Sequence, residues 1–123
     1  LVFDEAYAEF APSGALLPLD AADPRLIRLR TFSKTHGLAG MRVGYAIAAP
    51  EIVAAFDKIR LHFGVGRLSQ IAAAAAVDDP AFEAQTVAAV AARRRDCEGL
   101  GRGLCLPVLD SHANFVRKVS ATL

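Results

Sequence analysis

The chain has 123 residues, of which 54% are hydrophobic and 22% are charged, and its formal net charge is +1. This composition is typical of a packed globular protein and excludes a disordered chain. The nearly balanced charge gives no reason to expect nucleic acid or an anionic membrane as a partner, and no apolar run approaches the roughly 18 residues of a membrane-spanning helix.

The first part of the chain has the pattern of strands. An apolar run, Leu1–Phe3, ends in Asp4 and Glu5. This predicts a buried parallel strand that delivers acidic side chains at its carboxyl end. A loop rich in proline and glycine follows, and the apolar residues of 26–32 and 43–48 predict a second and a third strand.

Helical patterns dominate the rest of the chain. A proline at a first-turn position and apolar residues at helical spacing predict a helix over residues 50–60. An alanine-rich run predicts a second helix over 68–77. An Asp-Pro pair predicts the start of a long helix over 80–100, and a last apolar run predicts a strand over 113–119.

This order of elements predicts two units. Strands followed by helices indicate an open, mostly parallel α/β sheet in residues 1–79. The long helix and the last strand, in residues 80–123, indicate the start of a smaller α+β domain. We interpret the chain as part of a longer protein, because it begins on an apolar run without an initiator methionine.

One lysine stands where a reactive amine is expected. Lys34 follows the second predicted strand, beside the hydroxyl of Ser33, and Arg42 lies eight residues later (42 − 34 = 8). A partly desolvated lysine amine can attack a carbonyl, and strand ends of open α/β sheets are ligand sites. Ser33, Arg42 and the hydroxyl of Thr31 could hold a phosphate-sized anion. The alternatives are a loop lysine in solvent and an ordinary ion pair for Arg42.

Two residues after the first strand extend this chemistry. A carboxylate at Asp4 could keep a ring nitrogen protonated, as the pyridinium partner does in pyridoxal phosphate (PLP) enzymes. Tyr7, three residues later (7 − 4 = 3), could place its hydroxyl on the phenolic oxygen of that cofactor. The alternatives are a pair of solvated acids, Asp4 and Glu5, and a half-buried tyrosine. The ordered combination of these residues favours PLP.

Two stretches carry a resemblance to a known family. Asp4-Glu5-Ala6-Tyr7 and the run from Thr31 to Tyr45 resemble the class I/II aminotransferases of PLP fold type I, most of all the histidinol-phosphate aminotransferase group. The likeness covers essentially the whole chain. It implies the large PLP-binding domain with the start of the small one.

The same resemblance assigns a role to each matched residue. It implies that Lys34 forms the Schiff base with PLP and shuttles the proton, while Asp4 pairs with the pyridine nitrogen and Tyr7 bonds the phenolic oxygen. It also implies that the phosphate is bound by three further residues: Ser33, Arg42 and, as a weaker candidate, Thr31.

The activity implied is the transfer of an amino group between an amino acid, or histidinol phosphate, and a 2-oxo acid. The resemblance further implies a cytoplasmic homodimer active in amino-acid biosynthesis, histidine biosynthesis in particular. Three alternatives stay open: a PLP decarboxylase of the threonine-phosphate type, a non-catalytic aminotransferase-like regulatory module, and the product of a truncated gene. The three histidines, His36, His62 and His112, lack metal-ligand spacing, so no metal is expected.

Overall fold

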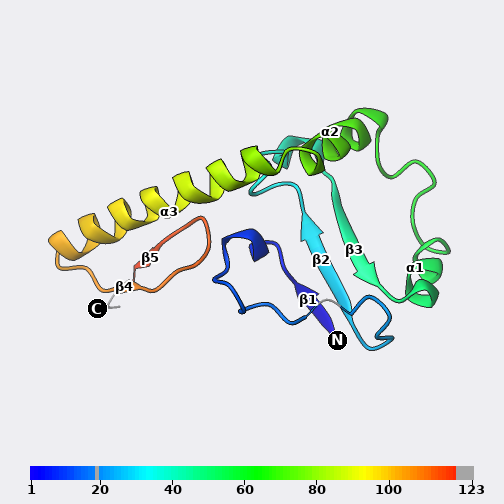
Figure 1. Cartoon of the computed structure of the whole chain (residues 1–123), viewed down its shortest axis with the longest axis horizontal. Coiled ribbons are helices and arrows are strands. Elements are labelled where there is room, and N and C mark those ends of the chain that lie inside the picture. The colour runs from blue at the N-terminus through cyan, green and yellow to red at the C-terminus, as the bar shows by residue number, and fades with distance from the viewer. Residues whose placement is uncertain (19, 119–123) are drawn as a thin grey trace.

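The N-terminal half of the chain forms a three-stranded sheet (Figure 1). The computed structural model describes residues 1–18 and 20–118. The strands are β1 (Val2–Asp4), β2 (Ile27–Thr31) and β3 (Gly44–Ala48), in the order β1-β2-β3. All three lie within a few residues of the predicted ranges, and the expected α/β class is confirmed.

The sheet is mixed. β1 pairs with β2 in parallel, with Asp4 opposite Leu29, whereas β2 pairs with β3 antiparallel, with Thr31 opposite Gly44. In the sheet of residues 1–79, which was expected to be mostly parallel, β1 and β2 are parallel, but the expectation does not hold for β3. Antiparallel pairing follows from the connection, since residues 32–43 contain only a short 3-10 turn, η2 (Ala39–Met41), and no helix that would carry the chain back for a parallel strand.

Three helices follow the sheet, as predicted: α1 (Pro50–Phe56), α2 (Arg67–Val77) and α3 (Pro80–Gly103). α3 starts as its sequence indicates, because the Asp79 carboxylate accepts a hydrogen bond from the Phe82 amide at 2.9 Å. The predicted length of α1 was wrong, since it ends at Phe56. Ile59, which lies within the predicted range, follows the observed end of the helix and is 80% exposed.

The C-terminal segment turns back along α3 (Figure 1). It contains the antiparallel pair β4 (Val108–Leu109) and β5 (Arg117–Lys118). β4 was not predicted. The strand expected over 113–119 is shorter within the described residues, because Ser111 Oγ donates to the Phe115 carbonyl at 2.6 Å and bends this part into a turn. Residue 119 lies outside the described residues.

Few apolar side chains are fully buried. Among the described residues they are Ala8 and Phe10 in η1 (Ala8–Phe10), Phe32 directly after β2, and Ala49 directly after β3. On α3, Val87, Val90 and Ala91 are half-buried, whereas Phe82 and Cys97 are exposed. Within the described part of the chain, no helix is both long enough and apolar enough to cross a membrane.

Gly44 allows β2 and β3 to approach closely. A Cβ atom at this position would lie 2.5 Å from the Arg30 carbonyl oxygen, which belongs to the backbone and cannot rotate away. We expect Gly44→Ala to lower the free energy of unfolding by about 2 kcal/mol or more, because the strands must separate to admit the methyl group.

The matched control is Gly40→Ala. No atom lies within 4 Å of a Cβ built at Gly40. This variant should therefore change the free energy of unfolding by less than about 0.5 kcal/mol in the same denaturation experiment. Equal losses in the two variants would contradict the close-approach explanation.

Candidate active site

A hollow of about 410 Å³ opens where β1 and β2 end. It brings together five of the six residues that the sequence singles out, from both strand ends and from the turn that follows β2. The residues around it are Asp4, Ala6, Leu29, Arg30, Thr31, Ser33, Lys34, Ala39 and Arg42. The sixth, Tyr7, lies beside the hollow and contacts Lys34.

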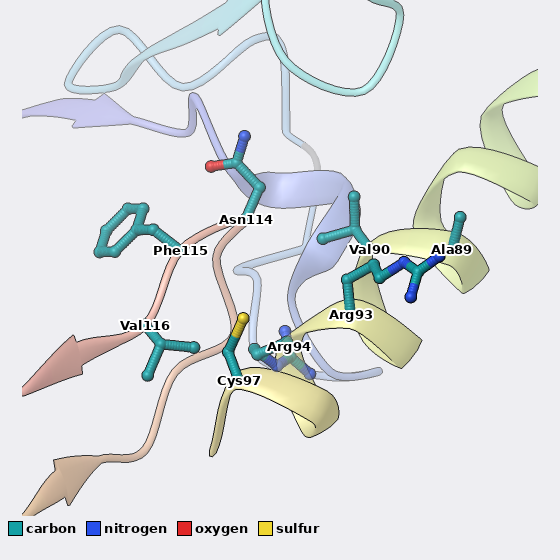
Figure 2. Close-up of a pocket in the computed structure, with 8 residues that line it drawn as sticks. All are labelled: Ala89, Val90, Arg93, Arg94, Cys97, Asn114, Phe115 and Val116. Carbon is teal, nitrogen blue, oxygen red and sulfur yellow. The ribbon is translucent and has the colours of Figure 1, made fainter. Parts of the chain in front are cut away.

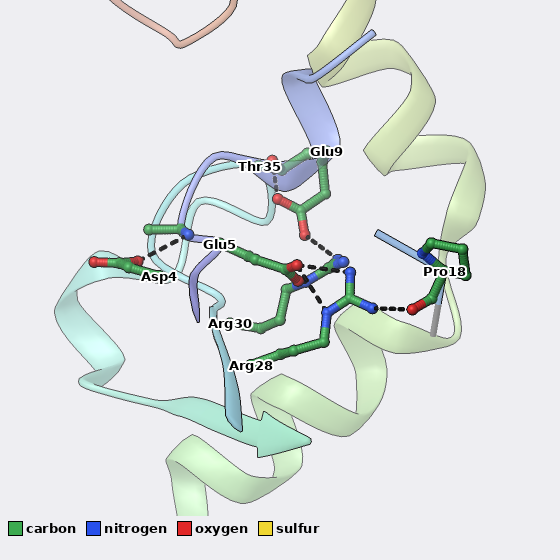
Figure 3. Close-up of polar contacts among 8 residues, drawn as sticks. Asp4, Glu5, Glu9, Pro18, Arg28, Arg30 and Thr35 are labelled. Atoms are coloured by element: carbon green, nitrogen blue, oxygen red, sulfur yellow. Dashed lines mark hydrogen bonds and ion pairs between the residues drawn. The ribbon is translucent and has the colours of Figure 1, made fainter. Parts of the chain in front are cut away.

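Asp4 and Glu5 are adjacent in sequence but point to opposite sides of the sheet (Figure 3). Successive residues of a strand alternate between faces, and the ladder continues to Glu5, whose amide donates to the Leu29 carbonyl at 2.9 Å. Asp4 therefore borders the hollow, where its Oδ1 accepts a hydrogen bond from the Ala6 amide at 3.1 Å. Its second carboxylate oxygen remains available to a ligand.

Two local hydrogen bonds, each donated by a backbone amide, hold the turn that carries Lys34. The Ser33 amide donates to Thr31 Oγ1 at 3.1 Å, and the Gly37 amide donates to the Lys34 carbonyl at 3.1 Å. Gly37 has a φ of 68°, a left-handed conformation that glycine adopts without steric cost. The lysine therefore stands on an ordered turn with hydroxyl groups on its N-terminal side.

Arg42 closes the hollow from the end of η2. It has a φ of 50°, so this non-glycine residue sits in the left-handed region, where a side chain costs energy. Its Nη1 donates to the Ala39 carbonyl at 2.9 Å, and among the described residues no carboxylate forms an ion pair with it. The structure therefore does not contain the ordinary ion pair considered as an alternative for Arg42. The guanidinium keeps N–H donors that can bind an anion.

Tyr7 lies between Lys34 and a distant segment of the chain. Lys34 Nζ stands 5.2 Å from the centroid of the Tyr7 ring, a cation–π distance. Phe115 meets the same ring edge-on, with centroids 5.6 Å apart and an interplanar angle of 81°. Lys34 is therefore not a solvent-facing loop lysine.

Behind the sheet, on the side away from Asp4, lies a buried ion cluster that the sequence analysis missed (Figure 3). Glu5, taken there as a possible solvated acid, is 8% exposed. It accepts hydrogen bonds from Arg28 Nε at 2.7 Å and from Arg30 Nε at 2.8 Å. Arg30 Nη1 also donates to Glu9 at 3.2 Å. The sequence did contain a signal for this cluster. Arg28 and Arg30 are two positions apart on one strand, so their side chains share one face of the sheet.

The cluster shifts the protonation of its members. Burial by itself raises the pKa of the Glu5 carboxyl, but the hydrogen bonds and charges of Arg28 and Arg30 outweigh burial, and the pKa lies below its ordinary value. Burial likewise opposes the charge of Arg30, yet hydrogen bonding to Glu5 raises the pKa of that guanidinium. Glu5 is thus a carboxylate under all mildly acidic and neutral conditions.

His36 does not join the hollow, although it lies two residues from Lys34. Its ring stacks at a tilt on Phe32, with centroids 5.1 Å apart, and its Nε2 is 3.5 Å from a carboxylate oxygen of Glu83 in the first turn of α3. His36 therefore lies on the loop after β2, between Phe32 and α3, and does not line the hollow.

A second hollow, of about 240 Å³, lies between α3 and residues 114–116 (Figure 2). Figure 2 shows Phe115 and Asn114 on one side of it and Val90 and Cys97 on the other. Its walls are mainly apolar, and it contains no lysine. The chemistry singled out in the sequence therefore gathers at the first hollow.

The comparison with protein families decides the relationship of this chain. Residues 1–118 match the family described as aminotransferase class I and II. The chain belongs to the class I and II aminotransferase family. The resemblance in the motifs around Asp4 and Lys34 is thereby confirmed at the level of the family.

Individual relatives agree with this family match. The chain is 44% identical to the histidinol-phosphate aminotransferase of Geotalea daltonii and 45% identical to that of Syntrophotalea carbinolica, over 94% of its own length in each case. A crystal structure of histidinol-phosphate aminotransferase from Sinorhizobium meliloti in complex with pyridoxal-5'-phosphate superposes with a TM-score of 0.88 at 43% identity.

The fold agreement extends beyond close sequence relatives. A putative histidinol-phosphate aminotransferase from Erwinia carotovora superposes with a TM-score of 0.89 at 32% identity, covering 98% of this chain and 36% of that one. The Sinorhizobium meliloti structure is covered to 32% of its length. The chain spans about a third of the length, 33%, of the curated relatives it matches.

Glu5 should make the stability of this chain depend on pH. Its pKa is lower in the folded state than the ordinary value of 4.5, so the folded state binds fewer protons than the unfolded state. Its contribution to stability is complete above pH 4.5 and is lost as the pH falls through the lower folded pKa. Urea denaturation across this pH range measures the loss.

Glu5→Gln is the variant that tests this dependence. It should lower the free energy of unfolding at neutral pH by about 3 kcal/mol or more, because Arg28 and Arg30 lose a buried counter-charge. It should also flatten the decline in stability at acidic pH. Glu51→Gln, on the exposed first turn of α1, is the control and should change neither quantity appreciably.

Proposed function

We propose that this chain supplies the cofactor-binding part of the active site in a PLP-dependent aminotransferase. The observation that carries the proposal is the convergence at one hollow of an amine, a carboxylate, two hydroxyls and a guanidinium: Lys34, Asp4, Ser33, Thr31 and Arg42. A tyrosine ring, Tyr7, lies against the amine.

The donor set fits the cofactor in chemical terms. PLP offers an aldehyde carbon for a lysine amine, a ring nitrogen for a carboxylate and a phosphate for hydroxyl and guanidinium donors. The side chains around the hollow include one group for each. Arg42 and Asp4 each keep hydrogen-bonding capacity that no described residue uses, which suits them to a ligand.

Each side chain has a distinct proposed role. The Lys34 amine is the covalent attachment point for the cofactor and later takes the substrate's α-proton at Nζ and returns it. Asp4 holds the proton on the ring nitrogen, and Tyr7 donates to the phenolic oxygen. Ser33, Thr31 and Arg42 bind the phosphate. The cofactor, when bound, supplies the electron-withdrawing ring that makes the α-proton removable.

The proposal extends to the whole protein. Residues 1–79 belong to the PLP-binding large domain, and residues 80–123 begin the small domain. The substrates are an amino donor, an amino acid or histidinol phosphate, and a 2-oxo acid acceptor. The names of the relatives support histidinol phosphate. The enzyme is a cytoplasmic homodimer, as the resemblance to the family implies, and acts in histidine biosynthesis.

Lys34→Ala tests the cofactor assignment. PLP added to the purified full-length protein should give a visible absorbance band, and the variant should lack it because no other lysine lies at the hollow. Lys58→Ala, an exposed lysine after α1, is the matched control and should keep the band. A band that survives in Lys34→Ala would remove Lys34 from its role.

A panel of amino donors tests the reaction. With 2-oxoglutarate as acceptor, the full-length protein should form glutamate from histidinol phosphate at least about tenfold faster than from donors without a phosphate, because a charged phosphate is recognised strongly. Release of carbon dioxide without glutamate would indicate a decarboxylase. Binding of PLP with no turnover of any donor would indicate a regulatory module.

A further inference from the structure

Glu9 connects the two segments whose side chains meet at the hollow. It lies in η1, two residues after Tyr7. Its carboxylate oxygen Oε2 accepts a hydrogen bond from Thr35 Oγ1 at 3.4 Å. Thr35 follows Lys34 directly, so one carboxylate joins the segment of Tyr7 to the turn of Lys34 (Figure 3).

Both partners of this hydrogen bond are shielded from water. Thr35 is 1% exposed, and the Glu9 side chain is 8% exposed. A buried hydroxyl group that loses its partner costs the free energy of its desolvation, so burial favours the arrangement in which the Thr35 hydroxyl stays paired with Glu9.

The position of the Glu9 carboxylate is also fixed by a second interaction, an ion pair with Arg30. Its other oxygen, Oε1, is 3.2 Å from Arg30 Nη1, and Arg30 Nε is 2.8 Å from Glu5. Arg30 belongs to β2, and Glu5 continues the β1 ladder. The carboxylate of Glu9 is therefore fixed to the sheet, and the turn after Lys34 is fixed to the carboxylate.

The contact that depends on this arrangement is the one between Lys34 and Tyr7. The ammonium group stands 5.2 Å from the ring centroid, and the ring is held edge-on by Phe115. A shift of the turn relative to η1 would move the ammonium off the ring, since the two segments are not adjacent in sequence.

We propose that Glu9 is a positioning residue for Lys34, which acts through the Thr35 hydroxyl to hold the amine against the Tyr7 ring. The proposal deepens the proposed function and rests on it for the importance of Lys34. The geometry itself exists in the chain without a cofactor and can be measured there.

The readout is the ring-current displacement of the Lys34 side chain. Full-length protein without cofactor is labelled with ¹³C-lysine, and Lys34→Arg identifies the ε-methylene resonance of Lys34 in the NMR spectrum. Tyr7→Leu gives the resonance without a ring. Lys58, which is exposed and distant in sequence, serves as the internal reference.

Thr35→Val is the decisive variant, because valine keeps the shape of threonine and removes only the hydroxyl. We expect it to move the Lys34 resonance most of the way to the Tyr7→Leu position, whereas Thr35→Ser, which keeps the hydroxyl, stays at the wild-type position. Glu9→Leu, which removes the acceptor oxygens, should move the resonance in the same direction, and it covers the case in which Thr35→Val fails to fold.

A double variant separates positioning from general loosening. In the Tyr7→Leu background, Thr35→Val should cause no further movement of the Lys34 resonance, because the two changes remove the same contact. A wild-type resonance in both Thr35→Val and Glu9→Leu would overturn the proposal. So would an equal movement of the resonance with and without the Tyr7 ring.

The loaded enzyme gives a second, independent readout. Misplacement of a reacting amine lowers the rate of the chemical step, so Thr35→Val should reduce kcat about tenfold with KM changed less than about twofold. If the wild-type protein shows no Lys34-dependent absorbance band with PLP, the proposed function fails. The NMR experiment still decides the role of Glu9 in that case.

Discussion

The buried carboxylate of Glu5 is the interaction on which the arrangement of this chain depends. It bridges Arg28 and Arg30 on β2 from the end of β1, and Arg30 passes the connection on to Glu9. Charge pairing thereby ties β1, β2 and η1 together. Its members are mutually satisfied, which is the condition for a buried charge cluster to be tolerated.

Strand alternation gives two neighbouring acids different roles. Asp4 and Glu5 differ by one position and therefore face opposite sides of the sheet. Asp4 borders the hollow with Lys34 and Arg42, whereas Glu5 lies in the ion cluster behind it. The side that carries the proposed chemistry is thus supported by the side that carries the charge pairing, and a shift of β1 by one residue would exchange them.

Much of the fold could be predicted from local patterns. Asp79 and Pro80 marked the start of α3 because capping is a local interaction. The length of α1 could not be predicted, because the helical spacing of apolar residues continues to Ile59 and does not by itself define where the helix ends. β4 has only two residues and exists through its pairing with β5, which no local pattern contains.

The candidate site shows the same division. The types and order of Asp4, Tyr7, Lys34 and Arg42 were sufficient to indicate PLP chemistry, because a reactive amine and its charged partners are rare in that combination. The sequence did not indicate that Glu9 and Thr35 join their segments. That link spans 26 positions and involves two residues with no chemical signal of their own.

The sequence by itself determined the family, the chemical groups available and most of the element boundaries, since these depend on residue type and short-range spacing. Only the tertiary structure decided which groups share a hollow, which acid is buried and which residue lies behind Lys34. Those outcomes depend on strand register and on pairings between distant residues, such as Asp4 opposite Leu29 and Glu5 between two arginines.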